Sequence, residues 1–261
     1  MEDYLEFAEE IAAEAGKIML KYFKEDNGAN YKFDQTIVTK ADTEINHYLV
    51  QQVKEKYPTH SVDGEEEQFG KSKYTWVCDP VDGTAMYARH IPVAVFSLAL
   101  VIDGVPNVGV VYDPFTNSLY TAIKGKGAYK NGIKIEVNNI ALDDMRSVSN
   151  FDIWPEAPYN IINSIAELGK KTYFVGIGSV IRACMCVANG DFNVAIFPGT
   201  KHKNCDIAAA KVIVEEAGGK VTDLFGNEQR YDGDINGAII SNGMVHDEVV
   251  DALKKMQSRK L

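Results

Sequence analysis

The chain has 261 residues and carries 27 basic and 37 acidic side chains, for a formal net charge of −10. A hydrophobic content of 46% and a charged content of 25% are typical of a globular protein, and they exclude a collagen, a disordered chain and a disulfide-rich miniprotein. The acidic balance argues against general binding to nucleic acid or to an anionic membrane, although it allows a small anion held through a metal ion.

The cysteines and the apolar runs bear on cellular location. Cys78, Cys184, Cys186 and Cys205 form no C-x-x-C pair and no disulfide framework. The opening MEDYLEFAEE lacks the apolar core of a secretory signal, and the longest apolar run, 93–102, is shorter than the roughly 20 residues that a membrane helix needs. We therefore expect a cytoplasmic protein that contacts no membrane.

The first part of the chain predicts two helices followed by several strands. Apolar residues recur at helical spacing over 5–23, and a second helix over 42–56 is stopped by Tyr57-Pro58. From Tyr74 onwards the pattern is that of strands. The predicted elements are strands at 76–78 (ending at Asp79-Pro80), 93–102 and 108–112, the last two joined through the turn Asp103-Gly104, then turn residues at 124–132 and a strand at 133–137.

The second part of the chain alternates strands and helices. The predicted strands are 173–175, 192–196 and 238–241, and the predicted helices are 179–188, 206–217 and 246–256. Gly218-Gly219 ends the middle helix. The change of pattern predicts an α+β lobe over residues 1–141, with most of the acidic motifs, joined to an α/β lobe over residues 142–261 that completes the active site.

Three segments place acidic residues beside small, turn-forming residues. They are Gly64-Glu65-Glu66, the run DPVDGT at 79–84, and Asp206-Ile207-Ala208-Ala209. Taken singly, each has a plain structural explanation as a solvated loop, a connecting turn or a helix N-cap. If Glu65, Asp79, Asp82 and Asp206 converge, however, like charges about 4 Å apart repel by about 4 kcal/mol at an effective dielectric constant near 20. Such a cluster needs cations to stay ionised.

The type of donor points to one cation. Carboxylate oxygens suit Mg²⁺, whereas zinc fits poorly because the cysteines are scattered and no histidine pair has ligand spacing. Two Mg²⁺ would balance four carboxylates, and a third would balance the roughly −2 charge of a phosphate monoester. Gly83 lets the backbone approach a ligand, and a short helix starting at Thr84 would direct free N–H groups at a phosphate. The alternative is a plain turn.

Together these motifs resemble the inositol monophosphatase family, within the lithium-sensitive, magnesium-dependent sugar phosphatases. The resemblance rests on WVCDPVDGT (76–84), DGEEE (63–67) and DIAAAKVIVEEAGG (206–219). It is extended almost end to end by VTKAD (38–42), GVVYDPFTNSLYTAIKGKGAYKNG (109–132) and GSVIRACMCVANG (178–190). The resemblance implies a five-layer αβαβα sandwich of the inositol monophosphatase and fructose-1,6-bisphosphatase type, commonly a homodimer.

The resemblance also implies a set of metal ligands. Glu65, Asp79 and the backbone carbonyl of Val81 would hold a first Mg²⁺, and Asp79, Asp82 and Asp206 would hold a second. Glu65 would help to hold a third, weaker ion and would thereby take part in catalysis.

The remaining roles that the resemblance implies concern water and substrate. Thr84, hydrogen-bonded to Asp42, would orient and deprotonate the attacking water, and Gly83, Thr84 and Ser179 would contact the substrate. For Asp42 there is an alternative, because Thr39-Lys40-Ala41-Asp42 also fits a helix capping box.

Three departures from the family pattern bear on the substrate. His90 stands where glycine is usual and either reaches the pocket or lies on the surface, and Cys205 stands where tryptophan is usual. Gly199 replaces a glutamate that binds a ring hydroxyl in the true inositol enzymes, and the basic residues Lys201 and Lys203 follow it. These lysines would favour a substrate with a second negative group; the alternative is a basic surface loop.

The expected function is Mg²⁺-dependent hydrolysis of a small phosphorylated metabolite by direct attack of a metal-activated water. The substrate would be a sugar or polyol phosphate that resembles inositol 1-phosphate or fructose 1,6-bisphosphate. Alternatives are a phosphatase for 3′-phosphoadenosine 5′-phosphate or for histidinol phosphate and, in another class, a non-catalytic scaffold with the same fold.

Overall fold

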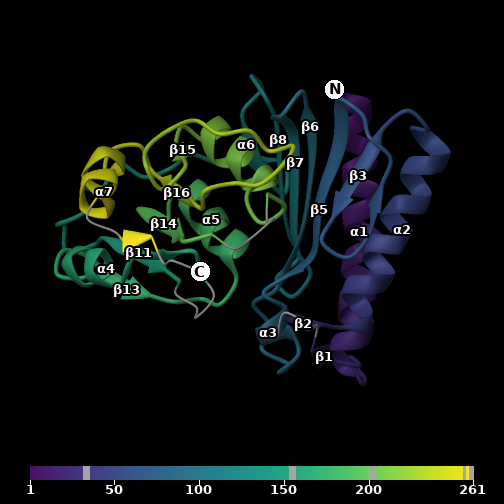
Figure 1. Cartoon of the computed structure of the whole chain (residues 1–261), viewed down its shortest axis with the longest axis horizontal. Coiled ribbons are helices and arrows are strands. Elements are labelled where there is room, and N and C mark those ends of the chain that lie inside the picture. The colour runs from purple at the N-terminus through teal and green to yellow at the C-terminus, as the bar shows by residue number, and fades with distance from the viewer. Residues whose placement is uncertain (32–35, 153–156, 200–203, 255–256, 259–261) are drawn as a thin grey trace.

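Helices and sheets stack in alternating layers (Figure 1). The computed structural model of the chain describes residues 1–31, 36–152, 157–199, 204–254 and 257–258. Across the molecule the layers are α1 (Glu2–Lys24) with α2 (Lys40–Lys56), a large sheet, α5 (Val180–Ala188) with α6 (Ala208–Glu216), a smaller sheet, and α4 (Ile162–Leu168) with α7 (His246–Leu253). The expected five-layer αβαβα sandwich is confirmed. None of the described helices is both long enough and apolar enough to cross a membrane.

The larger sheet has eight strands and is antiparallel except where β3 pairs with β5. In sheet order its strands are β10 (Ile133–Lys134), β9 (Ala128–Lys130), β8 (Ser118–Ile123), β7 (Val105–Asp113), β6 (Val95–Ile102), β5 (Tyr74–Asp82), β3 (Ser61–Gly64) and β4 (Gln68–Phe69). α1 and α2 pack on one face and α6 on the other. Its central strands are therefore buried on both sides, which explains why β6 is a continuous apolar run in the sequence.

The smaller sheet has five strands and is mixed. In sheet order they are β13 (Tyr173–Val175), β11 (Val148–Phe151), β14 (Val194–Phe197), β16 (Ala238–Ser241) and β15 (Lys220–Thr222). Short elements complete the described chain: β1 (Asn30–Tyr31), β2 (Ile37–Val38), α3 (Thr84–Tyr87), β12 (Tyr159–Asn160) and β17 (Gln257–Ser258). The first sheet ends at Lys134 and the second begins at Val148. The division into lobes 1–141 and 142–261 stays a prediction.

The predicted helices and most predicted strands are confirmed, with four differences. The strand predicted over 133–137 is limited to β10, Ile133–Lys134. β5 does not end at Asp79-Pro80 but continues to Asp82, with a shift in register between Asp79 and Asp82. Pro80 cannot donate to the ladder, and the irregularity removes it from regular pairing. The turn predicted over 124–132 contains β9, because pairing with β8 outweighs the local glycine and lysine content. The helix predicted from Asp206 begins only at Ala208.

α6 approaches the large sheet closely at Gly109, on β7. A Cβ atom at this position would lie 2.5 Å from Val212 Cγ1 and 2.8 Å from the backbone oxygen of Ala209. The Ala209 oxygen belongs to the backbone of α6, so it cannot rotate away as a side chain can. Packing at this point therefore requires a glycine.

We expect Gly109→Ala to lower the free energy of unfolding by about 1–3 kcal/mol, because α6 must move away from the sheet. Urea denaturation measures the change. The matched control is Gly233→Ala, at an exposed glycine whose added Cβ would have no heavy atom within 4 Å, and it should have little effect. Equal destabilisation by the two substitutions would contradict this account of the packing.

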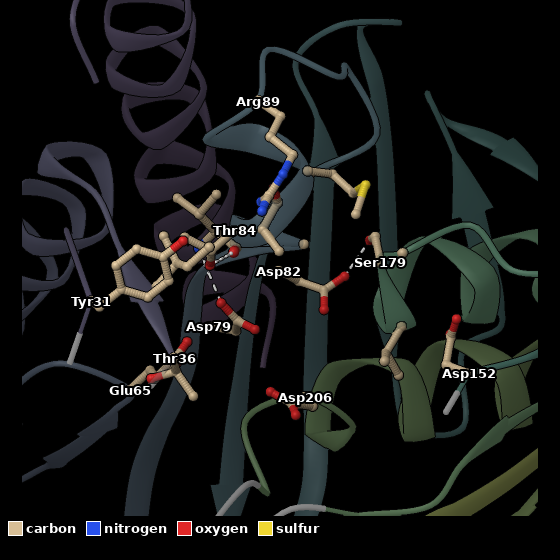
Figure 2. A pocket seen from close by; sticks show the side chains of 17 residues that line it. Tyr31, Thr36, Glu65, Asp79, Asp82, Thr84, Arg89, Asp152, Ser179 and Asp206 are labelled. Atoms are coloured by element: carbon tan, nitrogen blue, oxygen red, sulfur yellow. Dashed lines mark hydrogen bonds between the residues drawn. The ribbon is translucent and has the colours of Figure 1, made fainter. Parts of the chain in front are cut away.

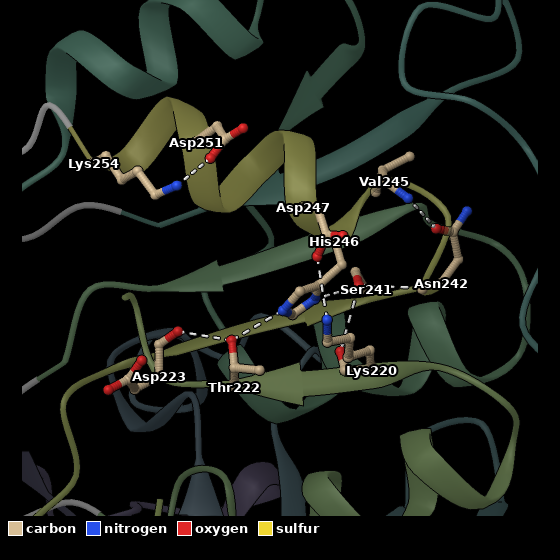
Figure 3. A network of polar contacts seen from close by, with 11 residues as sticks. Lys220, Thr222, Asp223, Ser241, Asn242, Val245, His246, Asp247, Asp251 and Lys254 are labelled. Carbon is tan, nitrogen blue, oxygen red and sulfur yellow. Dashed lines mark hydrogen bonds and ion pairs between the residues drawn. The ribbon is translucent and has the colours of Figure 1, made fainter. Parts of the chain in front are cut away.

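A buried histidine links α7 to the smaller sheet (Figure 3). His246 is 1% exposed, its Nδ1 lies 2.8 Å from Ser241 Oγ, and its Nε2 lies 3.0 Å from Thr222 Oγ1. Burial, reinforced by the nearby charge of Lys220, lowers the pKa of His246 from 6.5 to about 4. The ring is therefore neutral at physiological pH and joins β15, β16 and α7.

This shift predicts a contribution to stability that depends on pH. Because the folded pKa lies below the unfolded value, the unfolded chain binds more protons between pH 6.5 and about 4. The contribution is complete above pH 6.5 and is lost as the pH falls towards 4. We expect urea midpoints of the wild type to fall more steeply over this range than those of His246→Gln. His47→Gln, at an exposed ring, should keep the wild-type slope; identical slopes for wild type and His246→Gln would refute the prediction.

Candidate active site

The acidic segments meet at one cavity of about 460 Å³ (Figure 2). Glu65, Asp79, Asp82 and Asp206 all line it. They come from the turn after β3, from two positions on β5 and from the segment before α6. The fold thus brings together the four acids that were expected to converge, and Gly83, Thr84, Val81 and Ser179 line the same cavity.

These acids share the cavity without forming a compact cluster. Among the described residues, no three His, Cys, Asp or Glu side chains form a group that could hold an ion on their own. Mg²⁺ commonly takes only one or two carboxylates and completes its coordination with water and substrate phosphate. Oxygen donors spread around an open cavity therefore fit Mg²⁺ better than a metal that needs a closed set of protein ligands.

The segment between Asp79 and Thr84 is held by its own hydrogen bonds. The backbone N–H of Val81 donates to Asp79 Oδ1 at 3.0 Å, and Thr84 Oγ1 donates to the carbonyl oxygen of Val81 at 2.8 Å. These bonds order the irregular end of β5, with the carboxylates of Asp79 and Asp82 on either side of Pro80 and Val81. Glycine is required at position 83, where φ is +87° and an added Cβ would lie 3.0 Å from Ser179 Cβ.

Asp82 is fixed by the first turn of α5. Ser179, the N-cap of this helix, donates its hydroxyl to Asp82 Oδ2, and the backbone N–H of Ile181 donates to the same oxygen at 2.9 Å. Burial raises the pKa of Asp82 to about 7; the Ser179 hydrogen bond opposes this, and the charge of Asp206 adds to it. An ionised Asp82 is therefore costly here unless a cation lies nearby, so this environment fits a bound metal.

Asp42 forms the predicted capping box, and its other oxygen lies next to Thr84, while its catalytic role stays a prediction. Its Oδ2 accepts the backbone N–H and the hydroxyl of Thr39, which completes the capping box of α2. The Thr84 hydroxyl, which donates to the Val81 carbonyl at 2.8 Å, also lies 3.3 Å from Asp42 Oδ1, so its single proton has two alternative acceptors. Burial raises the pKa of Asp42 to about 7, against the effect of the Thr39 hydrogen bond. A carboxyl group with such a pKa can accept and return a proton near neutral pH.

The turn that carries Glu65 depends on Asn46, a buried residue of α2 that the sequence did not single out. Asn46 Oδ1 accepts the backbone N–H groups of Glu66 and Glu67 at 2.9 and 3.1 Å, and its Nδ2 donates to the Glu67 carbonyl at 3.0 Å. A Cβ at Gly64 would lie 2.3 Å from Asn46 Oδ1. Gly64 is therefore needed to leave room for the Asn46 side chain. Asn46 could have been singled out from the sequence as a polar residue on the buried face of a predicted helix.

One predicted substrate-contacting residue, His90, does not line the cavity, and for two others the prediction stays untested. His90 is exposed, its Nδ1 lies 2.8 Å from the carbonyl oxygen of Phe23, and its ring packs on that side chain. Lys201 and Lys203 lie outside the described residues. Gly199 has φ +84°, and an added Cβ would lie 3.1 Å from the backbone nitrogen of Gly237. A glutamate at this position would therefore be strained.

The cavity is also lined by residues that the sequence analysis missed, including Tyr31, Arg89 and Asp152. Asp152 follows β11 and accepts Asn150 Nδ2 at 2.6 Å, and burial raises its pKa. Neither Arg89 nor Asp152 belongs to a motif with a recognisable spacing. Only the three-dimensional arrangement places them at the site.

The five-layer sandwich and its oxygen-lined cavity define the class of metal-dependent phosphatases. The sequence model of the inositol monophosphatase family matches residues 1–258, and the chain belongs to this family. A fructose-1,6-bisphosphatase/inositol-1-monophosphatase from Thermotoga maritima is 30% identical over 256 residues, 97% of each chain. A histidinol-phosphatase from Mycobacterium tuberculosis is 30% identical over 85% of this chain and 86% of its own. A solved Thermotoga maritima IMPase superposes with a TM-score of 0.85 at 29% identity, covering 97% of both chains.

Family membership confirms the expected enzyme class, a phosphoric monoester hydrolase. The alternative of a non-catalytic scaffold finds no support in these relatives, which are named for phosphatase activity.

The two threonines that bond to Asp42 should have separable effects. Thr39→Val removes the hydroxyl cap of α2, so the free energy of unfolding should fall by about 1 kcal/mol. The backbone N–H of residue 39 still donates to Asp42 Oδ2, so activity should fall much less than in Thr84→Val. Thr84→Val removes the hydroxyl that faces the cavity, so kcat should fall by about 10²- to 10⁴-fold with little change in stability. Urea denaturation and phosphate release measure the two effects. If Thr39→Val abolished activity while Thr84→Val kept it, the assignment of roles would be reversed.

Proposed function

We propose that the chain hydrolyses a small sugar or polyol phosphate monoester with Mg²⁺ as its metal. The observation that carries this proposal is the cavity itself, where four acids from separate segments face the hydrogen-bonded pair of Thr84 and Asp42. Its volume suits a substrate of the size of inositol 1-phosphate or fructose 1,6-bisphosphate. The name of the Thermotoga relative, which combines both activities, also supports this substrate class.

In this proposal the acids hold two Mg²⁺ ions. Glu65, Asp79 and the Val81 carbonyl oxygen would hold the first, and Asp79, Asp82 and Asp206 the second, with a third, weaker ion near Glu65. When bound, Mg²⁺ lowers the pKa of the attacking water and stabilises the leaving oxygen. Two observations support this assignment. All the donors are oxygen atoms, and burial raises the pKa of Asp82, which an adjacent cation would lower again.

Thr84 and Asp42 would handle the proton of the attacking water. Thr39 holds Asp42 Oδ2, so Oδ1 stays directed at the Thr84 hydroxyl. When Thr84 donates to Asp42, a lone pair of its oxygen is left to accept a hydrogen bond from water. This pair would orient the water and pass its proton to the buried carboxylate, with no covalent bond between enzyme and phosphate.

A second candidate substrate is histidinol phosphate. The histidinol-phosphatase from Mycobacterium tuberculosis supports it, and so does Gly199, where an acidic side chain for a ring hydroxyl does not fit. A phosphatase for 3′-phosphoadenosine 5′-phosphate stays a further alternative. A homodimer, a cytoplasmic location and inhibition by lithium are also proposals, and composition and family resemblance are their support.

The metal assignment is tested by calorimetric titration of Mg²⁺ and by phosphate release from inositol 1-phosphate, fructose 1,6-bisphosphate and histidinol phosphate, with and without Li⁺. We expect Asp79→Asn and Asp206→Asn to weaken Mg²⁺ binding at least tenfold and to reduce kcat by at least 10²-fold, since each removes a charged donor. Asp251→Asn, at an exposed acid paired with Lys254, is the control and should match the wild type. Unchanged Mg²⁺ binding in both cavity variants would contradict the assignment of Asp79 and Asp206 as metal ligands.

A further inference from the structure

One basic side chain lines the described part of the cavity, among five acidic ones. It is Arg89, and the acids are Glu65, Asp79, Asp82, Asp152 and Asp206. Arg89 lies two residues beyond the end of α3, and Figure 2 shows its side chain extending towards the cavity on the side of Thr84. The substrate therefore faces carboxylates on one side and a guanidinium group on another.

Most of the guanidinium of Arg89 is available to a ligand. Its Nη1 donates to the carbonyl oxygen of Ala85 at 2.6 Å. Within the described chain this is its one hydrogen bond, and it forms no ion pair there, although five carboxylates line the same cavity. A guanidinium carries five N–H donors in a planar fork, so several donors remain. The bond to Ala85 also restrains the side chain, which lowers the entropy cost of binding.

A purely structural role explains only part of this arrangement. By donating to Ala85, Arg89 stabilises the last turn of α3, as cations near helix C-termini do. That role uses one donor and does not require the positive charge to line the cavity. A neutral donor such as glutamine would serve it equally well, so the charge itself calls for another explanation.

We propose that Arg89 determines specificity by binding a second anionic group of the substrate, a phosphate or a carboxylate. The inference rests on the proposed phosphatase function and narrows its substrate class to phosphomonoesters that carry another negative group. Arginine suits this task because its fork matches both groups in a bidentate manner. The exposed ring of Tyr31, on the same cavity, offers an apolar surface to the carbon skeleton between the two anions.

Two matched pairs of esters test the inference and separate the two anions. Glycerol 3-phosphate and 3-phosphoglycerate differ by a carboxylate, and fructose 1-phosphate and fructose 1,6-bisphosphate differ by a phosphate. We expect Arg89→Gln to raise KM about 10- to 100-fold for at least one doubly anionic ester, with kcat little changed, and to leave KM for its singly anionic partner within about twofold. Arg89→Lys should restore part of the lost affinity, because it keeps the charge without the fork.

Arg146→Gln, at an exposed arginine paired with Asp144 and outside the cavity lining, is the control for a general loss of positive charge. Equal changes in KM for both members of each pair, or a change in kcat alone, would overturn the role of Arg89 while leaving the phosphatase function intact. If the wild type released no phosphate from these esters, or from inositol 1-phosphate, at any Mg²⁺ concentration, the proposed function would fail and this inference with it. Thermal melting of each variant shows whether it is folded.

Discussion

Burial of carboxylates beside one cavity is the constraint on which the rest of the site depends. Asp79, Asp82 and Asp206 are almost fully buried beside one cavity, and burial raises the pKa of Asp82 to about 7. Burial removes water from these carboxylates, which makes their ionised forms unfavourable for folding. Under the proposed function, this cost falls at the place that would hold a divalent cation and a phosphate. A destabilising feature of the polypeptide would then be the basis of its chemistry.

Hydrogen bonds from neighbouring elements keep these acids in place. Thr39 at the start of α2 holds Asp42, Ser179 at the start of α5 holds Asp82, and Asn46 within α2 shapes the turn that carries Glu65. For Asp82 and Glu65 a helix contributes the donor or acceptor and the large sheet contributes the acid or its turn, whereas Asp42 belongs to α2 itself. Packing of the helices on the sheet therefore does more than bury the hydrophobic core, because it also sets the geometry of the site. Side chains that never touch the substrate should therefore influence catalysis through the acids that they orient.

Local periodicity predicted the main helices, and contiguous motifs predicted the four acids. The layered fold was predicted through the resemblance of those motifs to a known family. The sequence did not predict Asn46, Arg89 or Asp152, whose importance arises only when distant segments meet. β9 was missed for the same reason, since its glycine-rich surroundings suggest a turn and only pairing with β8 makes it a strand. Asp42 was given two alternative explanations, a capping box and a contact with Thr84, but the structure shows that they do not exclude each other. One carboxylate oxygen forms the capping box and the other faces Thr84.

The sequence predicts the type of reaction more fully than it predicts the substrate, and this difference has a physical origin. Hydrolysis of a phosphate ester needs oxygen donors in a narrow set of positions, which short motifs can encode. The rest of the cavity wall is assembled from single residues such as Tyr31, Arg89 and Asp152, each from a different part of the chain. A single amino-acid substitution in this wall alters its charge or shape without displacing the acids. Gly199 illustrates this, because its positive φ and its approach to Gly237 strain any larger side chain while Asp206, a few residues away, still reaches the cavity. Substrate choice can therefore diverge within the family while the chemistry stays fixed.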